Sequence, residues 1–275
     1  MICSAMGGEE GLEMGQWANF LSAMLLTLVR VSGIVVFAPF FSASALPARA
    51  KAVFVGVVAF LLAPAIASLP KAHVEMNFAS LTGELAVGLV YGIILALLNE
   101  MLLFAGEIVG LQLSFSAVNL LDPTSSIQTP LMSNLFQMMG TLVVIAAGLD
   151  RIVLASLVRS FHAVPLGTYA LLPVTSRAMV QAAGGIFLAA VELAAPVLAA
   201  TMLVEIAVAL LSRLSPQLPV MSLSVPLKTM VGFGVLTASL AVWPRFIEAR
   251  FAGLLDMAQS LLQVAPDVAG TGMGG

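Results

Sequence analysis

The sequence predicts an all-α protein of the integral-membrane type, with six or seven hydrophobic bent helices arranged as hairpins. Of the 275 residues, 60% are hydrophobic and only 9% are charged, and the mean hydropathy is +1.09. One soluble core cannot bury that much apolar surface. The apolar residues also fall in runs of about 20, the length at which a helix crosses a hydrocarbon core.

The charge and cysteine content exclude several classes of function. A formal net charge of -3 provides no basic field for nucleic acid. The single cysteine, Cys3, excludes an intrachain disulfide and a multi-cysteine metal site. The sequence has no P-loop, HExxH, CxxC or GxSxG motif. We therefore expect a protein that is not an enzyme and that needs no cofactor or metal.

The first apolar run, residues 17–37, carries a single charge, Arg30. Residues 1–14 before it are expected to be disordered, and their acidic composition does not fit a cleaved signal peptide. Helical periodicity places Arg30 in a narrow stripe of small and polar residues with Asn19, Ala23 and Gly33. An arginine that snorkels to an interface is one interpretation. We prefer a helix that packs on protein along this stripe.

Three further runs follow, over residues 52–69, 81–98 and 101–121, with an interruption expected at Asn99 and Glu100. Glycines spaced four apart, which allow helix backbones to approach closely, occur in the last two runs at Gly88 and Gly92 and at Gly106 and Gly110. The fourth run also places Glu100, Glu107 and Ser114 almost on one face. That face is either a path for protons or cations or a polar surface buried against sister subunits.

The central stretch, residues 106–139, starts and ends as membrane-type helix but breaks between Asp122 and Pro130. An irregular backbone in lipid has no water to satisfy its N–H and C=O groups, so it survives only inside protein or beside an aqueous cavity. The break is therefore either an ordinary surface loop or a segment held in a channel.

The C-terminal half contains three or four more helices. Residues 131–149 form the fifth run, and its continuation to Phe161 makes either one helix or two. Thr175 or Ser176 is a suitable N-cap for a long helix to Leu211, with a kink expected at Pro196. Residues 220–242 are the last apolar run, and residues 244–264 are amphipathic. We expect one domain over residues 15–262 and a flexible tail over 263–275.

Several separated segments resemble one known family. The segment LDR at 149–151 followed by SFHAVPLG at 160–167 resembles the pattern "helix, Ser-Phe, Pro-hydrophobic-Gly" of the flagellar export-gate family FliR, whose type III secretion counterpart is SctT. Residues 205–232 are similar to its "Arg, Pro-Gln-Leu, Pro-Leu-Lys, Val-Gly" region. Residues 106–130 resemble its central helix and loop, and Arg30 with the turn at 46–51 also matches. The resemblance covers roughly residues 15–260.

The resemblance implies an all-α subunit of a helical multi-subunit export-gate assembly in the bacterial inner membrane, within the flagellar basal body. Its expected partners are the FliP and FliQ proteins (SctR and SctS in secretion systems), the export proteins FlhB and FlhA, membrane lipid and unfolded protein substrates. One copy of the chain would close the ring of a narrow channel. The central loop would project into the lumen as a plug.

The resemblance also implies two sets of site residues. The pore plug and lumen lining would comprise Phe115, Leu121, Asp122, Pro123, Thr124, Ser125, Ser126, Gln128, Pro130, Met132 and Met138. Intersubunit polar contacts would come from Arg30, Glu100, Glu107, Arg151, Glu205, Arg213 and Lys228.

Two other interpretations stay open. A secondary ion-coupled transporter would use Glu84, Glu107 or Glu192, and its fold would contain inverted repeats, which the two halves of the sequence do not show. Alternatively, the charges only snorkel to the interfaces and the central break is a surface loop.

Overall fold

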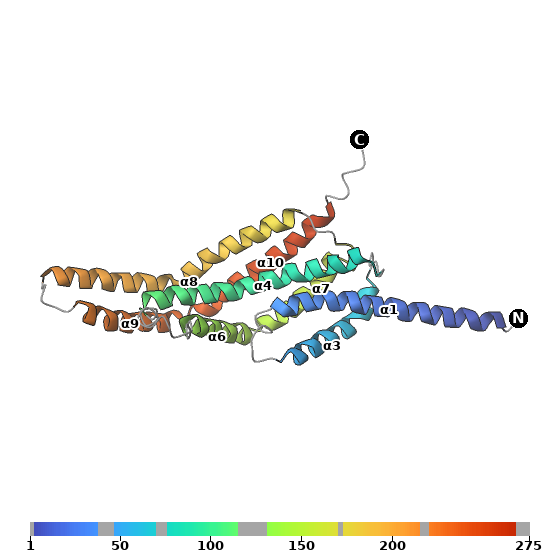
Figure 1. Cartoon of the computed structure of the whole chain (residues 1–275), viewed down its shortest axis with the longest axis horizontal. Helices are drawn as coiled ribbons and strands as arrows, with labels where there is room; N and C mark the ends of the chain where they lie inside the picture. Colours follow the sequence, from blue (N-terminus) through green and yellow to red (C-terminus); the bar gives the residue numbers. More distant parts are fainter. Residues whose placement is uncertain are drawn as a thin grey trace, which may run out of the picture. The chain divides into compact units, whose positions relative to one another are not determined.

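The structure is a computed structural model that describes residues 3–37, 47–69, 76–114, 131–169, 173–214 and 220–267. Within these ranges the regular backbone is helical, with no strand, which confirms the all-α prediction (Figure 1). The helices are α1 (Cys3–Phe37), α3 (Ala48–Ala67), α4 (Phe78–Gln112), α6 (Leu131–Ala146), α7 (Leu149–Ala163), α8 (Pro173–Leu214), α9 (Val220–Ser239) and α10 (Trp243–Asp267).

Four segments are long and apolar enough to cross a membrane, namely Trp17–Phe37, Ala48–Ala67, Phe78–Gln112 and Val180–Leu214. Two further pairs, α6 with α7 and α9 with α10, each pass the same test together across a short bent break. Counting each pair as one span brings the number in the described residues to 6. This agrees with the predicted membrane-type architecture of broken hydrophobic helices.

The contacts of the chain divide it into two compact units, and the single domain expected over residues 15–262 stays a prediction. The first unit comprises Met1–Ala96, Asp150–Ala182 and Ala252–Gly275, and the second comprises Leu97–Leu149 and Ala183–Phe251. Each unit is therefore assembled from stretches that are distant in the sequence. The helices α4, α8 and α10 each contribute residues to both units.

In the first unit, α1 packs against α3 and α4. The rings of Phe20 and Phe60 meet edge to face with centroids 5.8 Å apart. On the other side, Gly33 faces Gly88 so closely that a Cβ added to Gly88 would lie 2.5 Å from the carbonyl oxygen of Arg30. Ala23, Arg30 and Gly33 are all buried, so the predicted packing stripe on this helix is confirmed for them, although Asn19 is exposed.

Several helix boundaries differ from the sequence predictions. The helix α4 continues through Asn99 and Glu100, where an interruption was expected. The side-chain Oδ1 of Asn99 accepts a hydrogen bond of 2.8 Å from Nε2 of Gln137 on α6, so this polar side chain has a partner within the second unit. The helix α1 begins at Cys3, inside the stretch expected to be disordered. The helix α10 extends to Asp267, inside the expected tail.

The fifth apolar run and its continuation form two helices, α6 and α7. Gly148, between them, has a φ of +68°, a left-handed conformation that glycine adopts without a steric penalty. The N–H groups of Ala147 and Gly148 still donate to the carbonyls of Val143 and Ile145, so α6 is closed by backbone hydrogen bonds before the chain turns.

Candidate functional site

The central break predicted from the sequence lies between the end of α4 and the start of α6. Most of the predicted plug residues fall outside the described residues: Phe115, Leu121, Asp122, Pro123, Thr124, Ser125, Ser126, Gln128 and Pro130. The structure does describe both ends of the break, and these ends form the candidate site. We call this region, residues 99–114 of α4 and its end together with residues 131–140 of α6, the base of the central segment.

The helix α4 ends in a tight backbone turn. The N–H of Leu113 donates to the carbonyl of Val109 at 2.9 Å, and the N–H of Ser114 donates to that of Leu111 at 3.1 Å. Ser114 has a φ of +64°, a left-handed conformation that is uncommon for a residue other than glycine and that commonly ends a helix. Leu113 is buried, so the end of α4 is held in the protein.

The start of α6 packs directly on the backbone of α4. A Cβ added to Gly106 would lie 2.5 Å from the Cα of Ser133, so only glycine fits between these two backbones. One turn further along, a Cβ on Gly110 would be 3.3 Å from Cβ of Met132. Leu113 follows Gly110 by three residues on the same side of α4. The chain therefore leaves α4 and returns to α6 at adjacent points.

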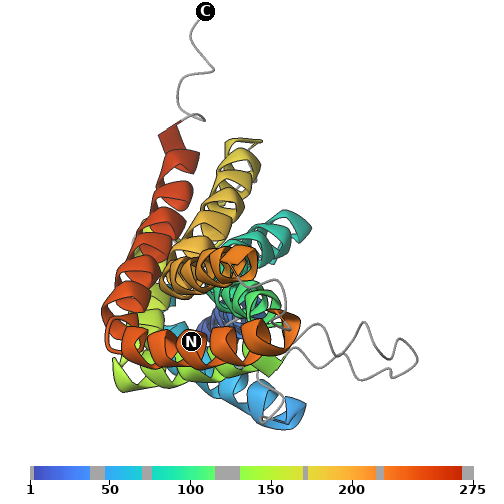
Figure 2. The same cartoon turned by 90° about the vertical axis from the view of Figure 1, so that its left-hand side faces the viewer.

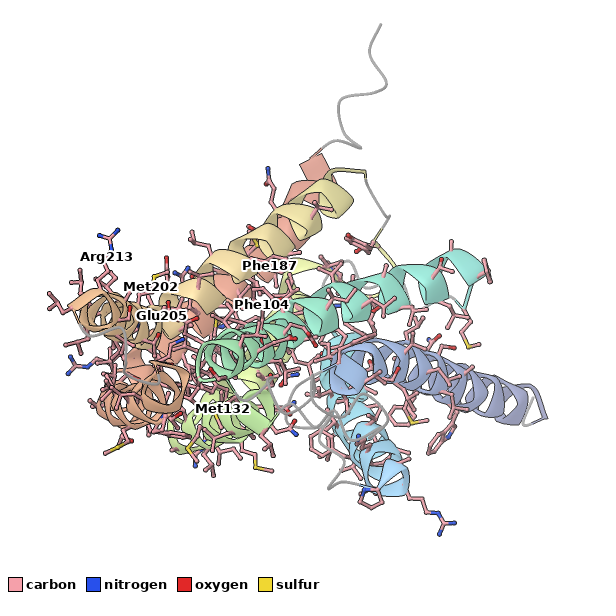
Figure 3. All side chains as sticks on the ribbon, turned by 60° about the vertical axis from the view of Figure 1, so that its left-hand side comes forward. Phe104, Met132, Phe187, Met202, Glu205 and Arg213 are labelled. Carbon is pink, nitrogen blue, oxygen red and sulfur yellow. The ribbon has the colours of Figure 1, made fainter. Side chains whose placement is uncertain are left out.

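Other contacts within the second unit hold this base in place. Gly140 on α6 leaves room for the side chain of Leu102 on α4. The rings of Phe104 on α4 and Phe187 on α8 meet edge to face with centroids 5.0 Å apart (Figure 3). Gly232 on α9 accommodates the side chain of Leu113, and α9 passes alongside this end of α4 (Figure 2). Helices α8 and α9 thus pack against the two helices that flank the break.

The two predicted lumen residues that the structure describes have different environments. Met138 is exposed, with 67% of its surface accessible. Met132 is buried, because its side chain fills the space above Gly110 between α4 and α6. Met132 was expected to line the lumen, and in this chain it instead anchors the start of α6.

The predicted intersubunit charges also divide into two groups. Glu100, Glu107, Arg151 and Arg213 are exposed, and Arg213 projects away from the ribbon of α8 (Figure 3). Glu205 on α8 and Lys228 on α9 form an ion pair with each other, in which Glu205 remains half exposed. The exposed group is free to meet other molecules, whereas the pair already links two helices of the second unit.

Arg30 was expected at a subunit interface, but its side chain is completely buried within the first unit. Its Nε donates to Oε2 of Glu84 on α4 at 2.5 Å. Its Nη1 donates to the backbone carbonyls of Ser160 and Val164, at 3.2 and 3.0 Å. This corrects the expectation, because no part of Arg30 is accessible to a neighbouring subunit. We call these interactions the Arg30–Glu84 clamp.

The clamp explains the segment at 160–167 that resembles the export-gate pattern. The guanidinium of Arg30 lies over the ring of Phe161, with 4.3 Å between Cζ of Arg30 and the ring centroid. The carbonyls of Ser160 and Val164 are at the C-terminal end of α7, where a helix favours a cation. Gly167, with a φ of +73°, donates its N–H to Oε1 of Glu84 at 2.9 Å. Helices α1, α4 and α7 are therefore joined by one buried ionic network.

Sequence reasoning missed Glu84 as the partner of Arg30 and assigned it only to the transporter alternative. A signal for the pair does exist in the sequence. Arg30 is the one charge in the run at 17–37, and Glu84 is the one charge within 81–98. Because an unpaired charge in a membrane-type helix is costly, two such lone charges of opposite sign are candidates for pairing.

The described residues contain no group of three or more His, Cys, Asp or Glu side chains placed to hold a metal ion. Besides the clamp, their ion pairs are Lys228 with Glu205 and Arg250 with Glu192. The polar chemistry of the described residues is thus dominated by single charge pairs between helices.

The relatives found by comparison with known proteins all carry the same name, and a family profile agrees with them. The chain is 27% identical over 255 residues to the flagellar biosynthetic protein FliR of Escherichia coli (strain K12), covering 91% of this chain and 97% of that protein. It is 26% identical over 236 residues to the FliR of Caulobacter vibrioides, covering 84% of this chain and 94% of the relative. For the FliR of Bacillus subtilis the identity is 25% over 259 residues, covering 90% and 98%. The sequence profile of the bacterial export proteins, family 1, matches residues 21–254. The chain therefore belongs to the bacterial export proteins, family 1.

Proposed function

We propose that this chain is a channel-forming subunit of the flagellar type III export gate in the bacterial inner membrane, where it closes a ring with FliP-type and FliQ-type subunits. In this role it passes unfolded export substrates, and FlhB-type and FlhA-type proteins act beside it. The family membership and the names of the relatives support an export component of the flagellum. The gating role rests on the base of the central segment.

The observation that carries the gating proposal is the close backbone contact of Gly106 with Ser133. It joins α4 and the first turn of α6, the two helices that flank residues 115–130, at a buried contact. A segment whose two flanking helices are packed against each other can move into and out of a lumen without separating those helices. An export gate needs such a part, because it must stay closed to ions and open to a polypeptide.

Exposed apolar surface supports a subunit that is covered by lipid or by neighbouring subunits. Along α8, Leu203 and Leu214 have exposed fractions of 67% and 80%, and Met230 on α9 reaches 75%. Many exposed large apolar side chains on neighbouring helices are typical of protein or membrane contacts. The exposed charges Glu100, Glu107 and Arg213 are then the polar contacts to neighbouring subunits.

The alternative, a secondary ion-coupled transporter, is less well supported. Two of its three candidate carboxylates already have cationic partners in the chain, Glu84 with Arg30 and Glu192 with Arg250. An ion-coupling carboxylate must bind and release its ion, and a fully buried pair such as the first one opposes that exchange. Glu107 is exposed and stays a candidate.

Deletion of residues 122–129 tests the gating proposal. We expect the complex with FliP-type and FliQ-type subunits to assemble, because the base at Gly106, Met132 and Ser133 is retained. We also expect the inner membrane to leak ions. The measurements are co-purification of the complex and the collapse of membrane potential in intact cells, followed with a potential-sensitive dye.

A matched variant replaces the same residues by an equal length of glycine and serine. It should leak less than the deletion, since it restores bulk but not the native side chains. A deletion variant that assembles and holds the membrane potential of the wild type would contradict the plug role. A chain purified as a monomer or dimer that binds a small solute would favour the transporter.

A further inference from the structure

A groove of about 440 Å³ lies within the first unit, between α7 and α10. Its walls are one face of each helix. The α7 wall carries Arg151 and Arg159 at its two ends, with Ile152, Ala155 and Ser156 between them, and the α10 wall carries Ala252, Leu255, Asp256 and Gln259. The groove combines a positive rim with an apolar floor.

The two arginines are available to a ligand. Both are exposed, and within the part of the chain that the structure describes neither takes part in a salt bridge. They are eight residues apart, so their backbones are about 12 Å apart along the helix axis. Asp256 across the groove is the one lining acid. The groove therefore carries one more cation than anion.

The two helices that form the walls differ from the helices that qualify as spans. Neither α7 nor α10 qualifies as a membrane span by itself, and each passes the test only together with the helix before it, from which it bends by 72° and 64° respectively. Each has a buried apolar side, with Leu157 and Phe161 on α7 and Phe251 and Leu255 on α10. Each also carries charges on its exposed side. Amphipathic helices of this kind lie at the boundary between headgroups and acyl chains.

We propose that this groove binds the headgroup of an acidic phospholipid, with the phosphate held by Arg151 and Arg159. Basic pockets between helices bind anionic headgroups in membrane proteins, and guanidinium groups match the geometry of a phosphate. The exposed apolar floor at Ile152 and Ala155 contacts the glycerol backbone and the start of the acyl chains. The lipid bridges α7 and α10 within the first unit.

Native mass spectrometry of the full-length chain in detergent tests this proposal. Phosphatidylglycerol is titrated against phosphatidylcholine, and the double variant Arg151→Gln/Arg159→Gln is compared with the wild type. We expect the wild type to bind phosphatidylglycerol more tightly than phosphatidylcholine. Because each arginine near an anionic lipid strengthens binding about five-fold, the double variant should lose about 30-fold in affinity for phosphatidylglycerol alone.

Two control variants test whether the lipid selectivity depends on the charge of the groove and on the groove itself. Arg213→Gln removes an exposed arginine of α8 outside the groove and should leave lipid selectivity unchanged. Asp256→Asn removes the acid in the groove and should raise the affinity for phosphatidylglycerol several-fold. Equal loss in the groove and Arg213 variants, or unchanged selectivity in the double variant, would overturn the proposal.

A third arm separates a lipid from other occupants. Soluble glycerol phosphate at the lipid concentration should not displace phosphatidylglycerol, because it lacks the acyl chains that contact the floor. Displacement by it would assign the groove to a soluble anion instead. Equal binding of both lipids by the wild type would also contradict the proposal and would favour a protein subunit as the occupant of the groove.

Discussion

The two units use ion pairs between helices in opposite ways. In the first unit, Arg30 and Glu84 are both completely buried, and backbone groups of the 160–167 segment bond to Nη1 of Arg30 and to Oε1 of Glu84, whereas Nη2 of Arg30 has no hydrogen-bond partner among the described residues. In the second unit, the pairs Lys228–Glu205 and Arg250–Glu192 keep one or both side chains partly exposed. Ion pairs between helices therefore lie in the core of the first unit and at the surface of the second.

The difference shows which charges the fold itself requires. A buried charge that loses its partner has no water to replace it, so removing one member of the clamp affects the whole first unit. A partly exposed charge regains water when its partner is lost, and the fold changes little. The surface pairs link helices but keep an exposed edge that other molecules can reach, whereas the clamp has none.

The largest effect is expected from Glu84→Gln. It leaves the charge of Arg30 buried without a counter-ion, and breaking a buried pair in this way costs about 3–5 kcal/mol of folding free energy. We expect a strongly lowered midpoint of thermal unfolding in detergent, or loss of monodisperse protein on size-exclusion chromatography. Glu205→Gln, at the partly exposed pair, is the matched control and should change the midpoint little.

The double variant Arg30→Met/Glu84→Leu shows whether the cost comes from an unpaired charge. Replacing both members by apolar side chains removes the buried charge as well as the pair, so much of the lost stability should return. If the double variant is as unstable as Glu84→Gln, the geometry of the hydrogen bonds to Ser160, Val164 and Gly167 matters more than charge balance.

A second, smaller effect tests the feature that both units share, the close contact of helix backbones at glycine. Gly88→Ala in the first unit and Gly106→Ala in the second would each place a Cβ 2.5 Å from backbone atoms of a neighbouring helix. Overpacking of this kind costs about 1–3 kcal/mol. Chemical or thermal unfolding of each purified variant measures it, and both should be clearly less stable than the wild type.

Gly56→Ala on α3 is the control for these variants, because a Cβ at Gly56 meets nothing within 4 Å. Alanine is the better helix former, so this variant should be unchanged or more stable by up to about 1 kcal/mol. Equal destabilisation at Gly56 and Gly88 would mean that the helix contacts differ from those described.

The glycine spacings and the stripe on the first helix were predictable from the sequence, because they depend on side-chain size at helical intervals. The partners of Arg30 could not be predicted from the sequence. Its hydrogen bonds go to backbone carbonyls up to 134 residues away, and every residue type carries such a carbonyl. The interruption predicted at Asn99 was wrong for a related reason. Asparagine and glutamate continue a helix at a small propensity cost, and Gln137 on α6 gives the polar side chain of Asn99 a partner that the sequence does not reveal.

The candidate site was predictable only in part. The break near Asp122 and Pro130 was evident from its composition, and the structure adds the adjacent anchors at its two ends. The burial of Met132 could not be inferred, because methionine occurs on lumenal, interfacial and core surfaces alike. Its position depends on Gly110 on another helix, a contact that spacing within one helix does not reveal.

The smallest effect is expected at the surface pair of the second unit. Lys228→Ala removes the partner of Glu205, whose side chain is 47% exposed and can be hydrated instead. Exposed pairs contribute about 0–1 kcal/mol, so the unfolding midpoint of the isolated chain should shift little. Because the proposed function assigns this region to contacts between subunits, co-purification with FliP-type and FliQ-type subunits should fall more than stability does.

The charge exchange Glu205→Lys/Lys228→Glu separates the two roles, since it restores the pair inside the chain but reverses the charges that a neighbour meets. Restored stability with impaired assembly would place these charges at an interface, and full recovery of both would confine them to linking α8 and α9.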